Sequence, residues 1–119
     1  MPDLSRDFVK GTGANLLVNI TNDAWYGKSV GPWQHARLAQ SRAVETRRSL
    51  LRVTNTGVTS LVNAKGELVE SLPMFVPDVL KTSVDILDGE TYYVRYGDWF
   101  AWGMTIITVA IVLFHLKRA

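Results

Sequence analysis

The stretch Leu16-Leu17-Val18-Asn19-Ile20-Thr21, followed by Asn22-Asp23-Ala24-Trp25-Tyr26-Gly27, decides the fold of this chain. An apolar run of this length, bounded by a polar loop with a glycine, predicts a strand over residues 15–21. We expect this strand to be central in its sheet, with cover on both faces. Because α/β proteins place their sites in loops at the carboxyl ends of such strands, the loop at residues 22–27 is the first candidate site.

The chain downstream of this loop predicts one helix and several strands. Residues 34–49 lack both Gly and Pro and predict a helix that begins near Pro32. Alternating polarity predicts a second strand at residues 51–55. The pair of segments at 59–62 and 67–70 flanks Asn63-Ala64-Lys65-Gly66, which favours a β-hairpin. Residues 79–86 alternate again and predict a half-exposed strand.

Residues 99–116 contain no Asp, Glu, Lys or Arg. As a helix they would be about 27 Å long, close to the hydrocarbon core of about 30 Å, and they predict a transmembrane helix. A buried core helix is the alternative. Aromatic residues crowd the amino-terminal side, as at a membrane interface. They are Tyr92, Tyr93, Tyr96, Trp99, Phe100 and Trp102.

Charge and composition exclude several kinds of site. The chain has 119 residues, no Cys and two His, so we expect no disulfide, no metal centre and no cofactor. Lys117 and Arg118 account for the whole formal net charge of +2, so basicity does not indicate a nucleic-acid partner. By the positive-inside rule these two residues place the tail, residues 117–119, in the cytoplasm and residues 1–98 on the other side of the membrane.

Four motifs follow one another along the chain. They are Asn22-Asp23-Ala24-Trp25-Tyr26-Gly27, Gly31-Pro32-Trp33-Gln34-His35, Arg42-Ala43-Val44-Glu45 and Leu51-Arg52-Val53-Thr54-Asn55-Thr56-Gly57. Over nearly the whole chain, the sequence that carries these motifs closely resembles the bacterial apolipoprotein N-acyltransferases, membrane enzymes of the nitrilase (carbon-nitrogen hydrolase) superfamily. The resemblance implies an α/β fold: the C-terminal half of a nitrilase-like αββα sandwich at residues 1–98, then one transmembrane helix.

The resemblance also implies an activity. Such enzymes transfer an acyl chain from a phospholipid, through a Cys thioester, to the α-amine of the diacylglyceryl-cysteine that begins an apolipoprotein. They use a Glu, Lys and Cys triad, and this chain has no Cys. We therefore read it as a fragment with no catalytic residue of its own, and expect it to be inactive alone.

The partners that the resemblance implies are the phospholipid donor, the apolipoprotein acceptor, the membrane and a missing amino-terminal part of the same enzyme. The expected location is the bacterial inner membrane, with the domain in the periplasm. A single span near the carboxyl terminus would leave its domain in the cytoplasm, so this placement requires further spans upstream.

Two groups of candidate site residues follow. The substrate-pocket candidates are Asn22, Asp23, Trp25, Tyr26, Gly27, Thr54, Asn55 and Thr56. A second group, expected to form a hydrogen-bonded layer that fixes the loop at 22–27 and the turn at 54–56, is His35, Arg42, Glu45 and Arg52.

Each group has a plainer interpretation. Asn22 and Asp23 would form an Asx turn that ends the strand. Trp25 would pack under the sheet instead of contacting an acyl chain or the lipopeptide. The stripe that His35, Arg42 and Glu45 form on the predicted helix would be an ordinary solvated face. A cluster of Arg side chains would hold a phospholipid headgroup or would form surface ion pairs. It consists of Arg37, Arg42, Arg47, Arg48 and Arg52.

Two other functions remain open. One is an amidase or nitrilase-type relative, either membrane-anchored or of the soluble type, and membrane extraction would separate a soluble-type relative from the membrane acyltransferase. The other is a non-catalytic, tail-anchored binding module. Its domain would face the cytoplasm, and protease accessibility of the domain in intact cells would reveal that.

Overall fold

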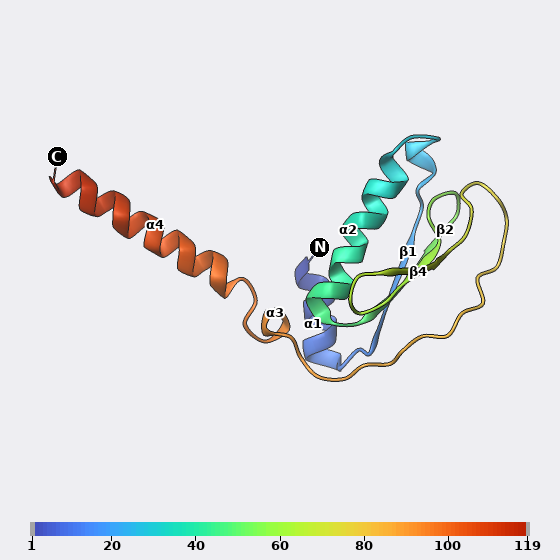
Figure 1. The fold of residues 1–119 in the computed structure, drawn as a ribbon, viewed down its shortest axis with the longest axis horizontal. Helices are drawn as coiled ribbons and strands as arrows, with labels where there is room; N and C mark the ends of the chain where they lie inside the picture. The colour runs from blue at the N-terminus through green and yellow to red at the C-terminus, as the bar shows by residue number, and fades with distance from the viewer. Residues whose placement is uncertain (1, 119) are drawn as a thin grey trace.

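The computed structural model describes residues 2–118 and shows an α/β unit followed by a helix that stands apart from it (Figure 1). The elements in chain order are α1 (Pro2–Thr12), β1 (Leu16–Thr21), the short 3-10 helix η1 (Ala24–Tyr26), α2 (Gly31–Thr46), β2 (Ser49–Thr54), β3 (Ser60–Val62), β4 (Leu68–Ser71), α3 (Tyr92–Tyr96) and α4 (Trp99–Arg118). The predicted α/β class is confirmed.

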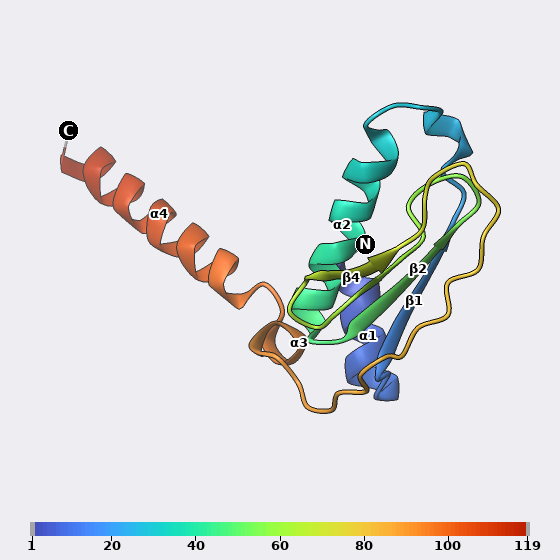
Figure 2. The same ribbon diagram turned by 45° about the vertical axis from the view of Figure 1, so that its right-hand side comes forward.

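The four strands form one sheet in the order β1-β2-β3-β4. β1 and β2 are parallel and in register, so that Thr21 lies beside Thr54 and both strands end at the same edge. The other pairs are antiparallel. α1 and α2 lie on one side of the sheet (Figure 2), where Val9 of α1 and Ala43 of α2 join Leu17 of β1 in the hydrophobic core.

β1 is an edge strand within the described residues, so the prediction of a central strand is wrong for this structure. Leu17 is buried, but Val18 is exposed and Ile20 is 79% exposed. Successive side chains of a strand point to opposite faces, so these two point away from the face that carries Leu17. The sequence shows apolar residues on both faces of the strand, but it does not show which elements cover those faces.

The helix α2 begins at Gly31, close to the predicted start near Pro32, and ends at Thr46, three residues before the predicted end. Arg47 ends the helix with a left-handed backbone, φ 56°, and β2 then begins at Ser49. A left-handed residue at a helix end is usually Gly, so an Arg in this position gave no signal. The helix α1 was not predicted at all.

The β-hairpin is confirmed. β3 and β4 pair antiparallel, and Gly66 in the connecting turn has φ 83°, a conformation that glycine adopts without strain. Asn63 holds this turn, because its Oδ1 accepts from the backbone N–H groups of Lys65 and Glu67.

The predicted strand at residues 79–86 is wrong. Residues 72–91, which we call the strap, contain no strand and run around the sheet as an extended segment (Figure 1). Side chains hold the strap in place of a ladder: Ser49 Oγ donates to the carbonyl of Asp85 at 3.0 Å, and Arg48 Nη2 donates to that of Gly89 at 2.7 Å. The alternating polarity of residues 79–86 therefore reflects an extended backbone that does not pair with a neighbouring strand.

Among residues 2–118, α4 is the one helix long and apolar enough to cross a membrane, by length and composition, and none of it is buried. The apolar helix predicted from residue 99 is therefore confirmed. Its end differs from the prediction, because Lys117 and Arg118 belong to the last turn of α4. The remaining tail residue, 119, lies outside the described residues, as does residue 1.

Candidate functional site

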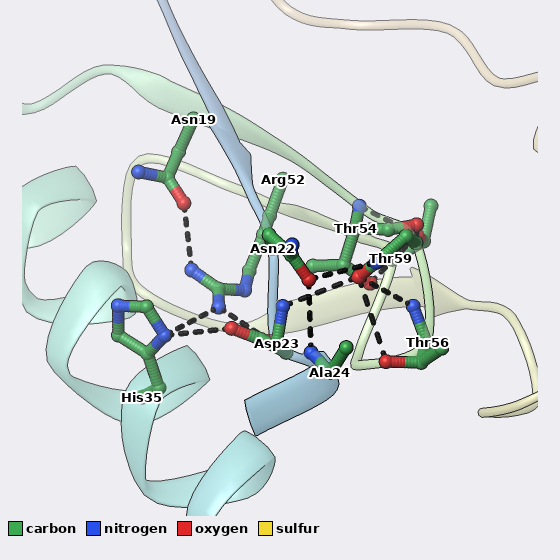
Figure 3. Close-up of polar contacts among 10 residues, drawn as sticks. Asn19, Asn22, Asp23, Ala24, His35, Arg52, Thr54, Thr56 and Thr59 are labelled. Atoms are coloured by element: carbon green, nitrogen blue, oxygen red, sulfur yellow. Dashed lines mark hydrogen bonds and ion pairs between the residues drawn. The ribbon is translucent and has the colours of Figure 1, made fainter. Parts of the chain in front are cut away.

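The carboxyl ends of β1 and β2 bring the two predicted polar segments together (Figure 3). Asn22 Oδ1 accepts from the backbone N–H of Ala24 at 3.0 Å and from Asn55 Nδ2 at 2.7 Å. Asn55 Oδ1 in turn accepts from the backbone N–H groups of Asp23 at 3.2 Å and of Thr56 at 2.9 Å. Asn22 thus forms the Asx turn of the plainer interpretation and also joins the loop after β1 to the turn after β2.

Asp23 is the centre of a buried ionic network (Figure 3). Its carboxylate is 2.9 Å from Arg52 Nη2 through Oδ2 and 2.8 Å from His35 Nδ1 through Oδ1. Arg52 also donates through Nη1 to Asn19 Oδ1 at 2.6 Å. Asp23 and Arg52 are each only 1% exposed. Arg52 Nη2 also lies 3.2 Å from His35 Nδ1, so the three side chains meet at one point.

This network corrects the expected role of Asp23. A side chain that is fully buried and held by Arg52 and His35 cannot line a substrate pocket. It instead fixes the start of the loop after β1 to β2 and to α2. Asp23 thus lies with His35 and Arg52, the two candidates for the supporting layer that contact it, rather than in an open pocket.

Gly57 belongs to the site, and sequence reasoning missed its role. A Cβ at this position would lie 2.7 Å from Asp23 Cβ, 2.8 Å from Cγ and closer still to Oδ2. Only glycine leaves room for the buried carboxylate, although its backbone is not left-handed. The signal available in the sequence was that Gly57 ends the motif that begins at Leu51, but nothing there indicates that it meets Asp23.

Arg42 and Glu45 do not join this cluster. They form an ion pair with each other, Arg42 Nη1 to Glu45 Oε2 at 2.7 Å. Thr91, which caps α3, donates to the backbone carbonyl of Glu45 at 2.6 Å. Burial raises the pKa of the Glu45 carboxyl above its ordinary value, and the neighbouring Arg42 opposes that shift. The stripe on α2 thus supports the loop at His35 and packs near α3 at its other end.

The predicted cluster of Arg side chains does not form one anion site. Arg48 is buried and donates to the carbonyls of Ala14 at 2.8 Å and Gly89 at 2.7 Å. Arg52 is buried against Asp23. Neither can reach a lipid headgroup, so these cations hold the fold together.

The remaining pocket candidates lie in the loop after β1, at the end of β2 and in the turn after β2. Trp25 is 85% exposed, so its packing under the sheet is excluded. The ring of Tyr26 lies over Gly31 and is tilted against His35, with 5.9 Å between ring centroids. Gly27 ends η1 with φ 52°. Thr54 is bonded to Thr59, whose hydroxyl accepts from the Thr54 backbone N–H at 3.1 Å.

A hollow lies on the side of β1 that faces α1 and α2. It is open, has a volume of about 670 Å³, and is bounded by α1, β1 and α2. Its walls are mainly apolar, and Asn19, His35 and Arg42 contribute polar groups. His35 is therefore shared between this hollow and the Asp23 network.

Comparison with known proteins identifies the family. The carbon-nitrogen hydrolase family model matches residues 1–93. The chain belongs to the carbon-nitrogen hydrolase family. The matched residues include the polar loop after β1 and the turn after β2. The match confirms the superfamily expected from the four motifs.

Individual relatives give a narrower likeness. The chain is 43% identical over 117 residues to the apolipoprotein N-acyltransferase of Geobacter metallireducens, covering 98% of this chain and 22% of that protein. The protein of the same name from Thermotoga maritima is 42% identical over 117 residues, with 98% and 23% covered. That from Haemophilus ducreyi is 39% identical over 105 residues, with 88% and 21% covered. The chain thus spans about a fifth of the length of these relatives.

Proposed function

We propose that this chain is part of an apolipoprotein N-acyltransferase, in which it builds one wall of the substrate pocket and supplies a membrane-spanning helix. The observation that carries the proposal is the exposed Trp25 on a loop at the end of two parallel strands, which the buried Asp23 and Arg52 and the half-buried His35 hold in place. Its similarity to three acyltransferases over most of its length supports the same conclusion.

In the proposed reaction, a Cys thiolate attacks an ester carbonyl of the phospholipid, a thioester forms and the lysophospholipid leaves. The α-amine of the diacylglyceryl-cysteine then attacks the thioester, an amide forms and the Cys is released. A Glu would act as base and a Lys would stabilise the oxyanion. The chain contains no Cys, so other sequence must supply this nucleophile. Within the reaction, Trp25 contacts an acyl chain or the lipopeptide.

The same proposal places α4 across the inner membrane. Its last turn carries Lys117 and Arg118, which belong on the cytoplasmic side by the positive-inside rule. The α/β unit is then periplasmic. Trp99 and Phe100 at the start of α4 would lie at the outer surface of that membrane, where aromatic side chains concentrate.

A chimera tests the proposal. This chain replaces the matching 117-residue stretch of the Geobacter metallireducens relative, and acyl transfer from phospholipid to a diacylated lipopeptide is measured in detergent. We expect the chimera to be active and the 119-residue chain alone to be inactive. A chimera that folds and enters the membrane but does not transfer would refute the proposal, and transfer by the isolated chain would refute the assignment of the nucleophile to other sequence.

The role of Trp25 has its own variant in this assay. Trp25→Ala should lower transfer about tenfold, the equivalent of about 1.4 kcal/mol of lost apolar contact, without lowering the unfolding temperature. Val79→Ala, which shortens another exposed apolar side chain, is the matched control. Full activity in Trp25→Ala would remove this residue from the site.

A further inference from the structure

Phe75 in the strap has an unusual backbone. Its φ is 63°, in the left-handed region that bulky residues avoid. Among the described residues, the other non-glycine residue with positive φ is Arg47, which ends a helix, where that conformation is common. Phe75 ends no helix. Glycine would adopt this backbone at lower free energy, so the aromatic side chain needs a reason of its own.

The structure places Phe75 against the candidate site. Its backbone N–H donates to the carbonyl of Thr56 at 3.2 Å, which attaches the strap to the turn after β2. The ammonium of Lys28 lies 5.8 Å from the centre of the Phe75 ring, a cation–π contact that reaches the strap from the loop after β1. The Phe75 ring therefore contacts the loop after β1, and the Phe75 backbone contacts the turn after β2.

Ring and loop together present apolar surface. Phe75 is 39% exposed, and its neighbour Val76 is exposed as well. A small cavity of about 100 Å³ separates this part of the strap from the turn that carries Thr54 and Asn55. A ring that served only to pack the strap would be buried, whereas this one remains partly open beside polar groups of the site.

We propose that Phe75 is a specificity-determining residue that forms, with Trp25, an apolar rim for the acyl chain of the lipid donor. The inference rests on the proposed acyl transfer and adds a residue to the same site. One part of the rim lies on the loop after β1 and the other on the strap, and Lys28, three residues after Trp25 in that loop, reaches the Phe75 ring. The backbone strain at Phe75 persists because the ring completes this rim.

The test uses the active chimera and two variants that suit a left-handed backbone, Phe75→Gly and Phe75→Asn. Both remove the ring and relieve the strain, so neither should lower the unfolding temperature appreciably. We expect the KM for a phospholipid with long acyl chains to rise about tenfold with kcat unchanged. The KM for a short-chain donor should change less than twofold. Val79→Ala, on the same strap and fully active, is the control.

Each outcome has a definite meaning. An unchanged KM for the long-chain donor in both variants would overturn the role of Phe75 while the proposed function stands. An equal loss for long and short donors, together with a lower unfolding temperature, would also overturn it and show that the ring only packs the strap. A parent chimera without transfer would refute the proposed function itself.

Discussion

Replacing Gly57 with Ala should be strongly destabilising, although an alanine is normally harmless where φ is not positive. The new methyl group would lie 2.7 Å from Asp23 Cβ and 2.8 Å from Cγ, so the buried carboxylate must move. Its movement separates Oδ2 from Arg52 Nη2, now 2.9 Å apart with both side chains buried. Breaking a buried ion pair costs about 3 to 5 kcal/mol. Because His35 can keep its bond to Oδ1, we expect about 3 kcal/mol.

Hydrogen–deuterium exchange in the chimera measures this effect locally. A loss of about 3 kcal/mol corresponds to a fall of about 100-fold in the protection of backbone amides in the loop after β1 and in β2. Gly11→Ala is the matched control, because Gly11 lies in α1 with open space around it. Alanine there should be neutral or stabilising by up to about 1 kcal/mol.

A double-mutant cycle separates the contact from other effects. In an Asp23→Gly background the methyl of Gly57→Ala meets no side chain at position 23, so adding it should change protection little. Coupling of about 2 kcal/mol or more between the two substitutions would match a direct contact. If Gly57→Ala is as harmless as Gly11→Ala in the otherwise unchanged chimera, the close approach to Asp23 does not stabilise the site.

Three further predictions concern the fold. Residues 1–98 alone should show poorly dispersed amide NMR signals and no cooperative melting, because Ile20 and the outer edge of β1 are uncovered; a dispersed spectrum with a sharp transition would contradict this. Burial raises the pKa of Glu45 above its ordinary 4.5, so the folded state favours the protonated acid and loses stability as pH rises above that value. Melting of Glu45→Gln as a function of pH should lack this decline, and an unchanged profile would exclude it. Arg48→Met should release the strap near Gly89 and speed amide exchange there, whereas equal exchange would show that other contacts hold it.

The sequence by itself determined the features that local pattern encodes. The apolar run at Leu16–Thr21 predicted a strand and the polar loop after it, and the uncharged segment from residue 99 predicted a long apolar helix. Gly66 predicted the turn of the hairpin. Each of these features follows from the conformational preferences of neighbouring residues. These preferences act on a segment wherever that segment lies in the fold. The order of the four motifs was enough to indicate the family.

Only the tertiary structure decided which distant side chains meet. Asp23 seemed a pocket residue because it follows a strand, yet Arg52 and His35 enclose it and Gly57 leaves room for it. Residues 79–86 of the strap alternate in polarity as a strand does, but they form no strand. The formation of a buried ion pair and the pairing of a strand both depend on groups far apart in the chain. The conformational preferences of neighbouring residues do not indicate whether such groups meet. The left-handed backbone of Phe75 belongs to the same class, because an aromatic residue gives no local signal for it.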